Sequence, residues 1–533
     1  MQDHKDILAR HVAARLGRRT ILKGMGAGMI AATTGGAFPA MAQAAQSGHI
    51  KIGEIKPIDT LDPHFTFRLG AVQIISNICN GLLKVVYDGT TVTFEPDLAA
   101  TWDLEDEKTH AFTLHPGVMF HDGTPCDAEA IKFNLMRVKS GTPASPHAWK
   151  LEKLEEVEII DPLTFKLHFS EPYAFLPVAL TGSIGRAGTI VSPAAVEKYG
   201  EDFGRNPVGT GPFKFVSWKE NDSIELVANT EYFEAGLPKL EKVSFMIIDE
   251  PSTALAALIS GQIDGMNDCP MQLIEQVKKM PNLNVYGGVE GNYTYVGMNT
   301  QKPPFDDVNL RRAVAFAIDR DAVLKQAYFG LAKQAYTPIS PPMSGFYDPD
   351  IAQSGRGQFY DLEKAKEFRA KAANQDEIEV TYIMTENPPA GTRVAQIVAP
   401  MLAEIGIKVK LELLENAAWT QRLQDRDFEM LDFFWTADLD PDETLYPEFK
   451  TDGSWNYWGW SNADFDRLCA EAQVILDVAA RSKLYNEAED LMVDEAPVAM
   501  LAHFPLYKIF SNKVQGFNYV PCDLLNLNTV SLA

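Results

Sequence analysis

One stretch of the chain changes its apolar periodicity twice, and this order restricts the possible folds more than any other feature. Residues 378–382 alternate apolar and polar side chains, which is typical of a half-buried strand. Residues 394–405 then carry apolar side chains at helical spacing, with Thr392 as a candidate N-cap and Gly406 as the stop. Strict alternation resumes in residues 407–413. The stretch therefore predicts a strand–helix–strand unit.

A second unit of the same kind lies earlier in the chain. Residues 243–248 have the composition of a strand that is covered on both faces. Pro251 opens a helix that stops at Ser260 and Gly261, and residues 263–266 return to extended structure. Between the two units, residues 310–318 form a further apolar helical stripe. Two separated units predict an α/β protein with two lobes.

Lobed α/β proteins bind ligands at the carboxyl ends of their strands, and two such ends fall in the later unit. One is Thr385–Gly391, and the other is Trp435–Asp442, which follows the apolar run Phe428–Trp435. An aromatic ring beside carboxylates can stack on a ligand and receive its ammonium group. We interpret Trp435, Thr436 and Asp438 in this way. Asp440 and Asp442 fit a turn equally well.

The N-terminus has the features of an export signal. Arg18 and Arg19 begin a motif typical of twin-arginine export, a weakly apolar stretch covers residues 24–37, and residues 39–44 offer an Ala-x-Ala cleavage site. The apolar stretch is too short to span a membrane. A basic amphipathic helix at a membrane surface is the alternative interpretation. We expect residues 1–44 to be a twin-arginine signal and the mature protein to be periplasmic.

Composition excludes several classes of partner. The chain of 533 residues has 48 basic and 72 acidic side chains. Without residues 1–44, 42 basic and 70 acidic residues remain, a net charge of −28. This charge argues against nucleic acid and anionic lipid as partners, and it weakly favours cationic ligands. With 46% hydrophobic residues, a chain of this length can form two to four domains or lobes.

The glycines in Pro207–Phe213 do not form a phosphate cradle. A phosphate loop runs into a helix whose first amides face the anion. Here Pro212 follows Gly211, and residues 213–218 have the alternation of a strand. We expect a tight turn that enters a strand.

Pro207–Phe213 resembles the signature of the family 5 extracellular solute-binding proteins, the peptide and nickel group that serves ABC importers. Further motifs agree with this family over nearly the whole mature chain, in order. They are the Trp102–Val138 stretch, Met298-Asn299, Leu310–Val314 with Ile318–Arg320, Ser461-Asn462 with Phe465-Asp466, Arg481 with Leu484-Tyr485, and Glu495–Pro497.

The resemblance implies a bilobal periplasmic-binding-protein fold, with two α/β lobes around a cleft and an extra subdomain in the first lobe. It implies a first lobe over residues 45–292, with the subdomain at about 88–205, and a second lobe over residues 293–507. Residues 508–533 would return to the first lobe. A ligand that bridges both lobes would stabilise the closed form without covalent chemistry.

The resemblance assigns binding residues unevenly. Peptide-binding members use an Asp in a Trp-x-x-Asp motif for the ligand ammonium, and Asp438 holds that position after Trp435. In dipeptide binders, an Arg just past the strand that corresponds to residues 378–384 binds the ligand carboxylate. This chain has Glu386 at that place. This departure favours longer peptides or amine-bearing solutes over dipeptides, because a buried acid needs a cationic partner. Arg186 is a candidate for the carboxylate, and a surface loop arginine is the alternative.

Other functions remain as alternatives at this point. The family resemblance also allows a nickel chelate, an opine or an oligosaccharide as the solute. A secreted hydrolase is a distant alternative, because the sequence lacks Gly-x-Ser-x-Gly, Ser-x-x-Lys and His-Glu-x-x-His. We expect no enzymatic activity, cofactor or protein metal site. We expect a monomer that delivers a small-molecule or peptide ligand to permease subunits in the inner membrane.

Overall fold

The computed structural model describes residues 48–66, 68–385, 389–436 and 439–533. The predicted export signal lies outside these residues. The described chain contains a seven-stranded, a six-stranded and a four-stranded sheet, together with two two-stranded sheets, β2-β3 (residues 83–87 and 92–96) and β20-β21 (residues 514–515 and 531–532). Among the described residues, no helix has the length and apolar character needed to cross a membrane.

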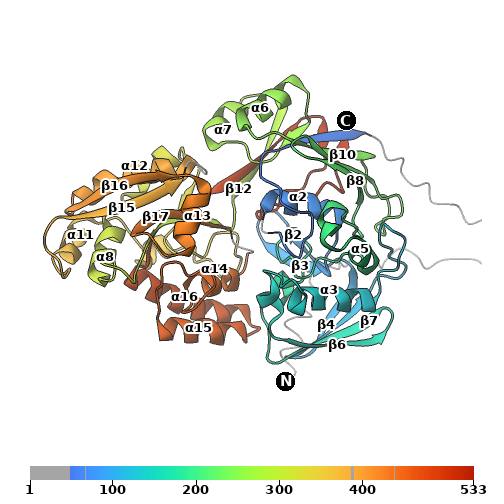
Figure 1. Cartoon of the computed structure of the whole chain (residues 1–533), viewed down its shortest axis with the longest axis horizontal. Coiled ribbons are helices and arrows are strands. Elements are labelled where there is room, and N and C mark those ends of the chain that lie inside the picture. The colour runs from blue at the N-terminus through green and yellow to red at the C-terminus, as the bar shows by residue number, and fades with distance from the viewer. Residues whose placement is uncertain (1–47, 67, 386–388, 437–438) are drawn as a thin grey trace, which may run out of the picture. The chain divides into compact units, whose positions relative to one another are not determined.

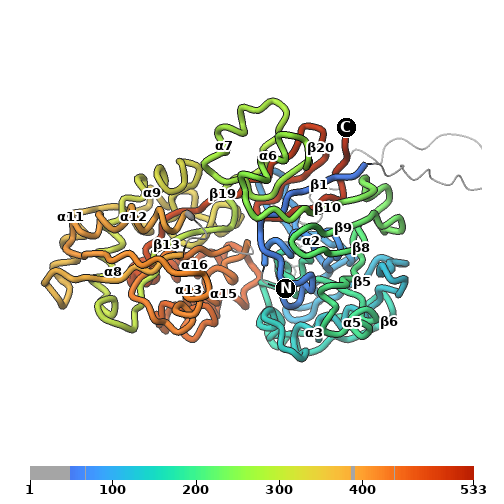
Figure 2. Tube along the Cα trace, turned by 45° about the horizontal axis from the view of Figure 1, so that its top comes forward, coloured from blue at the N-terminus to red at the C-terminus, as the bar shows by residue number. Residues whose placement is uncertain are grey.

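A seven-stranded sheet forms the core of the first lobe. Its strands, in spatial order, are β12 (Leu283–Val289), β19 (Pro505–Ser511), β11 (Gly265–Met266), β1 (His49–Glu54), β10 (Lys242–Ile247), β9 (Ser223–Ala228) and β8 (Phe213–Lys219). The C-terminal strand β19 thus joins the sheet of the N-terminal strand β1, and in Figure 2 the red C-terminal segment lies beside the blue one.

The earlier strand–helix–strand unit is confirmed in its elements. Strand β10 leads through α6 (Pro251–Ser260) to β11, and Gly261 ends the helix in a left-handed conformation (φ 76°). The two strands do not pair with each other, however, because β1 lies between them and is parallel to both. Ile50 and Ile52 of β1 are fully buried there. Burial of this N-terminal strand is a long-range effect that local periodicity does not encode.

A six-stranded sheet forms the core of the second lobe. Its strands, in order, are β14 (Lys333–Gln334), β18 (Val498–His503), β13 (Asn292–Met298), β17 (Met430–Thr436), β15 (Ile378–Thr385) and β16 (Ile407–Leu414). Helices cover both faces, and Figure 1 shows α12 and α13 with this sheet. One face packs on α8 (Val308–Ala317), α9 (Arg320–Ala327) and α12 (Pro389–Ala403). The other packs on α13 (Asn416–Gln424), α14 (Pro441–Phe449), α15 (Ala463–Gln473) and α16 (Val478–Glu495).

The later strand–helix–strand unit is also confirmed. Strands β15 and β16 pair in parallel from Ile378–Ile407 to Thr385–Leu414, and α12 connects them. The expected cap at Thr392 is wrong, because α12 already begins at Pro389. The Thr392 hydroxyl instead donates to the Thr385 carbonyl at 3.1 Å, which ties the helix to the end of β15.

A four-stranded antiparallel sheet, in the order β4-β5-β7-β6, forms the inserted subdomain of the first lobe. Its strands are β4 (Ala99–Asp106), β5 (Thr109–Leu114), β6 (Leu154–Asp161) and β7 (Thr164–Phe169), and α3 (Ala128–Ser140), η1 (Ala148–Leu151), α4 (Leu176–Ala179) and α5 (Pro193–Tyr199) accompany them. We call its apolar core the subdomain cluster. The buried members of this cluster come from residues 82–190, with Leu439 and Leu524 added.

Smaller elements complete the chain. They are α2 (Leu69–Ile78), β2 (Leu83–Tyr87), β3 (Val92–Pro96), η2 (Gly200–Arg205), α7 (Met271–Val277), α10 (Ile351–Ser354), α11 (Leu362–Arg369), β20 (Val514–Gln515) and β21 (Ser531–Leu532). The chain passes from the seven-stranded to the six-stranded sheet at residues 290–291 and returns at Phe504.

The glycine turn belongs to the first-lobe scaffold, as the sequence predicted. It leads directly into β8, and the Gly211 amide donates to the Ile78 carbonyl at 2.8 Å. A Cβ at Gly209 would lie 2.3 Å from the Ile78 oxygen, so the turn packs tightly against the end of α2. Glycine is used here for close packing and not for anion binding.

Candidate functional site

Trp435 and Thr436 end strand β17, where the rule for carboxyl ends places a ligand. The Trp435 side chain is only 9% exposed. Its Nε1 donates to the Glu443 carbonyl at 3.2 Å, and its ring lies edge-on to Trp455 with the centroids 5.5 Å apart. Thr436 is partly buried opposite Asn292 of β13. Trp435 is thus held by the second lobe, and little of its surface is left for a ligand.

The aromatic side chain most exposed at this strand end is one that sequence reasoning missed. Phe434 is 43% exposed, and its ring lies edge-on to Phe504 with the centroids 6.2 Å apart. Because side chains alternate along a strand, Phe434 shares the face of Thr436 and not that of Trp435. The apolar run Phe428–Trp435 contained Phe434, but the sequence did not show which face opens to solvent.

Among the described residues, strand β17 has a strand partner on only one side at its carboxyl end. It pairs with β13 over its whole length, from Asn292–Thr436 to Met298–Met430. In the described part of the chain it pairs with β15 only at Tyr382–Met430 and Ile383–Leu431. Residues 432–436 therefore have no strand partner on the β15 side within the residues that the structure describes. An extended ligand chain can hydrogen-bond to a strand edge of this kind.

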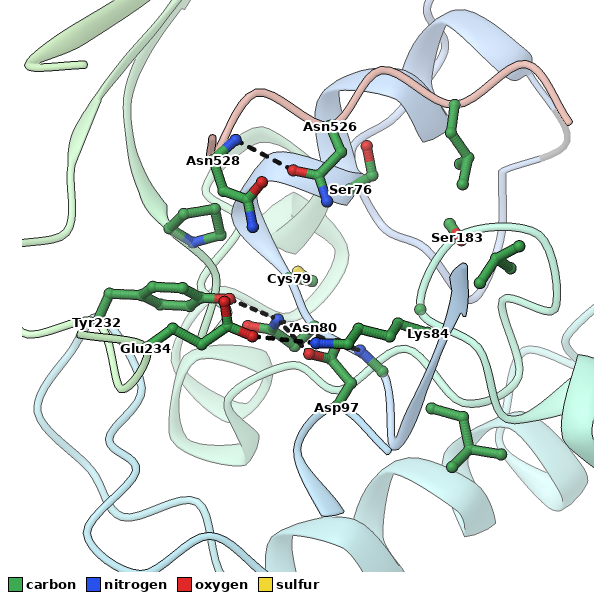
Figure 3. Close-up of a pocket in the computed structure, with 16 residues that line it drawn as sticks. Ser76, Cys79, Asn80, Lys84, Asp97, Ser183, Tyr232, Glu234, Asn526 and Asn528 are labelled. Atoms are coloured by element: carbon green, nitrogen blue, oxygen red, sulfur yellow. Dashed lines mark hydrogen bonds and ion pairs between the residues drawn. The ribbon is translucent and has the colours of Figure 1, made fainter. Parts of the chain in front are cut away.

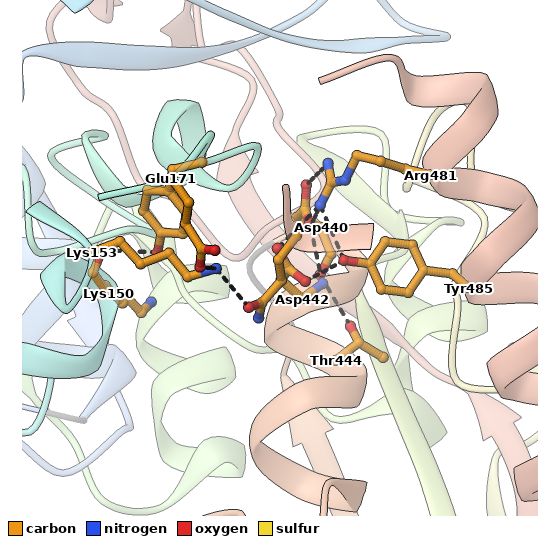
Figure 4. Close-up of polar contacts among 10 residues, drawn as sticks. Lys150, Lys153, Glu171, Asp440, Asp442, Thr444, Arg481 and Tyr485 are labelled. Carbon is orange, nitrogen blue, oxygen red and sulfur yellow. Dashed lines mark hydrogen bonds and ion pairs between the residues drawn. The ribbon is translucent and has the colours of Figure 1, made fainter. Parts of the chain in front are cut away.

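Asp440 and Asp442 are occupied within the second lobe. Asp440 caps α14 and receives two bonds from the Arg481 guanidinium, at 2.8 and 3.0 Å. Asp442 accepts from the same guanidinium at 3.1 Å and from the Tyr485 hydroxyl (Figure 4). Burial raises the pKa of Asp442 to about 6, against the opposing charge of Arg481. These two carboxylates have a structural role, in line with the turn interpretation.

Two of the predicted binding residues, Asp438 and Glu386, lie outside the described residues. The third charged candidate, Arg186, lies in the loop after α4 with a positive φ of 61°. Its Nε is buried and has no hydrogen-bond partner in the described chain. Burial lowers the pKa of the neighbouring His147 to about 2, and the positive charge of Arg186 is the second cause of this shift. His147 therefore stays neutral. A ligand carboxylate could take up the free Nε donor.

The strands of the first lobe also end in charged groups, which sequence reasoning missed. Lys56 follows β1, and its ammonium lies 2.7 Å from Asp268, which follows β11. Lys508 of β19 lies 2.7 Å from Asp523, which also bonds Lys56. All four side chains are largely buried. The carboxyl-end rule could have found Lys56 and Asp268, whereas Lys508 and Asp523 carry no local signal.

Two glutamates complete this first-lobe network. Glu54, the last residue of β1, accepts from the Asn267 amide at 2.9 Å, and burial raises its pKa to about 7. Glu290, at the first passage between the sheets, accepts from the Tyr519 hydroxyl at 3.0 Å, and burial raises its pKa to about 8. Both glutamates are fully buried. Burial therefore makes both carboxyl groups easier to protonate than free glutamates, which reduces the negative charge of the network near neutral pH.

A small pocket in the first lobe does not fit a peptide-sized ligand. It has a volume of about 80 Å³ and is lined by Asn80, Asp97, Tyr232, Lys84 and Glu234 among others (Figure 3). The Asn80 amide donates to Asp97 and Tyr232, and Lys84 lies 3.2 Å from Glu234. These polar groups satisfy one another. Within the described ranges, no three His, Cys, Asp or Glu side chains are grouped as metal ligands would be.

A larger cavity of about 250 Å³ lies between the inserted subdomain and α14. Aromatic and charged side chains from both lobes line it. They include Trp149, Lys153 and Tyr173 from the first lobe and Asp442, Tyr446, Lys450 and Gln473 from the second. The cavity is therefore next to the Asp442–Arg481 pair and has the polar and aromatic walls of a small-molecule site.

The sequence model of one known family covers most of the chain. It describes bacterial extracellular solute-binding proteins, family 5 Middle, and matches residues 93–457. The chain belongs to this family. Its members bind solutes outside the cytoplasm, and the two sheets joined at residues 290–291 and at Phe504 form the bilobal fold of periplasmic binding proteins.

Similar proteins support the same family. The glutathione-binding protein GsiB of Pectobacterium atrosepticum is 29% identical over 448 residues, which cover 82% of this chain and 85% of that protein. The periplasmic binding protein DppA of Helicobacter pylori, solved with the peptide STSA, is 27% identical with a TM-score of 0.80, over 92% of this chain and 99% of that one. CtaP of Listeria monocytogenes shares the fold, with a TM-score of 0.81 at 22% identity over 92% of this chain and 100% of that one.

Proposed function

We propose that this family 5 protein captures a peptide, or a similar amine-bearing solute, between its two lobes and delivers it to the permease of an ABC importer. The observation that carries the proposal is the carboxyl end of β17, where residues 432–436 have no strand partner on the β15 side within the described part of the chain. A peptide backbone has the donors and acceptors to pair there. The similarity to a peptide-bound DppA and to a glutathione-binding protein supports the same ligand class.

We assign the ligand contacts as follows. Asp438 binds the ligand ammonium, and Arg186 binds a carboxylate through its Nε donor, which has no partner among the described residues. Thr436 and Phe434 line the strand edge, with Trp435 as their support. Glu386 receives a second amine or leaves that end of the ligand without a free carboxylate.

We also propose that the protein works as a monomer in the periplasm and catalyses no covalent step. The twin-arginine motif at Arg18 and Arg19 supports the export route. Replacing both arginines with lysine should leave a precursor in the cytoplasm, as fractionation would show. Normal amounts of the double variant in the periplasm would rule out this route.

Calorimetry on Asp438→Asn tests the ligand assignment. The substitution keeps the shape and removes the charge, so it should weaken binding of the tetrapeptide STSA by about 2–5 kcal/mol. The N-acetylated tetrapeptide should bind wild type weakly, and it should bind Asp438→Asn with about the same affinity as it binds wild type. The matched control is Asp440→Asn, which removes a carboxylate bound to Arg481 and should lower stability.

Binding of the free and the acetylated peptide to wild type decides whether an ammonium group is recognised. If wild type binds the free and the acetylated peptide equally well, Asp438 does not bind an ammonium group. A bound peptide should also reduce the radius of gyration in solution scattering and raise the Tm. Tight binding that changes neither quantity would contradict capture by closure.

A further inference from the structure

The second lobe contacts the inserted subdomain through a defined set of side chains. The Lys150 ammonium lies 3.5 Å from a carboxylate oxygen of Glu443, which is in the first turn of α14. At the end of α15, the Gln473 side chain accepts from Lys153 at 3.0 Å, and its carbonyl accepts from the Ala174 amide at 3.0 Å. Figure 4 shows Lys150 and Lys153 facing the segment of Asp440 and Asp442.

Leu439 adds an apolar contact to these polar ones. It is 5% exposed and packs in the subdomain cluster, although it belongs to the second-lobe segment between β17 and α14. Its φ is 66°, in the left-handed region that is unfavourable for a leucine. A residue keeps such a conformation only where its surroundings enforce it. The contact with the subdomain cluster supplies a reason for this conformation.

The residues on either side connect Leu439 to the candidate site. Thr436, three residues before it, ends the strand to which we assign the ligand. Asp440, directly after it, is fixed by the bidentate contact with Arg481. The Asp440–Arg481 ion pair therefore restrains the backbone next to Leu439. Leu439 is also close in sequence to the proposed ligand contacts.

Lys150 adds an ion pair with Glu443 to the contact between the second lobe and the inserted subdomain. Its side chain is 2% exposed and its ammonium lies 5.3 and 5.6 Å from the ring centres of Trp149 and Phe175. A buried ammonium is costly without a carboxylate, and Glu443 supplies one from the other lobe. When the lobes separate, both groups regain water, so the pair specifies the docked arrangement more than it stabilises the chain.

We propose that Leu439, Glu443 and Gln473 form a latch that docks the second lobe on the inserted subdomain and sets ligand affinity without contacting the ligand. The inference rests on the proposed function, since it assumes capture by closure. A contact made only in the closed form adds its free energy to the apparent affinity. The same contact adds nothing to the stability of the open, ligand-free protein.

Leu439→Ala tests the apolar half of the latch. Loss of this buried side chain should weaken STSA binding about 10- to 100-fold. The Tm of the ligand-free protein should stay within error of wild type. The matched control is Leu445→Ala, a fully buried leucine of α14 inside the second lobe, which should lower the Tm of the ligand-free protein. An unchanged affinity in Leu439→Ala would overturn the proposal.

A cross-link tests the latch without any ligand. The Ala174 amide and the Gln473 carbonyl are hydrogen-bonded, so Ala174→Cys combined with Gln473→Cys puts two cysteines in backbone contact when the latch is docked. Under mild oxidation the double variant should form a disulfide, faster with STSA present, and each single variant should not. A double variant that never exceeds the single variants would overturn the latch.

Failure of the proposed peptide function and failure of the latch can be distinguished. If wild type binds no STSA, the proposed peptide function loses its support, and the cross-link in the ligand-free protein still decides the latch.

Discussion

Arg481→Met gives a sharp test of how the candidate site is supported. Arg481 is buried between Asp440 and Asp442, with side-chain exposures of 3%, 8% and 0% respectively. It makes three short bonds to these carboxylates, at 2.8, 3.0 and 3.1 Å. Methionine fills much of the same volume but leaves two buried acids without their cation. Breaking a buried ion pair from one side costs about 3–5 kcal/mol.

The loss should depend on pH, with a definite sign. Burial raises the folded-state pKa of Asp442 from 3.8 to about 6, so the folded chain binds its proton more tightly than the unfolded chain. Stability from this group therefore falls as the pH rises from about 4 to 6. Without Arg481 the opposing charge is gone and the folded pKa rises further. The cost of Arg481→Met should be larger at pH 8 than at pH 5.

Denaturant unfolding at both pH values measures this cost. Arg467→Met is the matched control, because Arg467 pairs with Asp464 and Glu471 on an exposed face of α15 and its removal should have little effect. An equal loss for Arg481→Met at pH 5 and pH 8 would refute the argument from burial. A loss no larger than that of the control would refute the role of the ion pair.

Two further predictions concern buried groups away from this ion pair. Glu448 is fully buried between the hydroxyls of Tyr293 and Tyr295, and burial raises its pKa to about 8 from 4.5, so wild-type stability should fall as the pH rises through this range. The unfolding free energy of Glu448→Gln relative to wild type should therefore increase by roughly 2–5 kcal/mol between pH 5.5 and pH 9. A difference between the two proteins that does not change with pH would contradict the raised pKa of Glu448. Gly209→Ala should cost about 1–3 kcal/mol, because its Cβ would lie 2.3 Å from the Ile78 oxygen, whereas Gly288→Ala, with open space at its Cβ, should be neutral in the same melts.

Part of the candidate site was accessible to sequence reasoning. The end of β17 was found because an apolar run followed by Trp435, Thr436 and acidic residues marks a strand end. The exposed face was not found, because periodicity within a continuous apolar run does not show that Phe434 opens to solvent. The first-lobe network was missed because Lys508 and Asp523 come from segments far from Lys56 in the sequence.

The sequence by itself determined the local elements and the family. The strand, helix and strand in residues 378–414 could be predicted because the spacing of apolar side chains reflects the local backbone geometry. That spacing can be read from residues that are near neighbours in the sequence. The glycine turn could likewise be recognised from the Pro212 and the strand that follow it.

Only the tertiary structure decided which elements and charges meet. Strand β1 entered between β10 and β11 because its apolar residues had to be covered on both sides, and no local signal names that neighbour. Asp440 and Asp442 met Arg481 because a buried carboxylate needs a cation, wherever in the chain that cation comes from. Periodicity is a property of short segments, whereas burial and charge pairing are satisfied only by the folded chain as a whole.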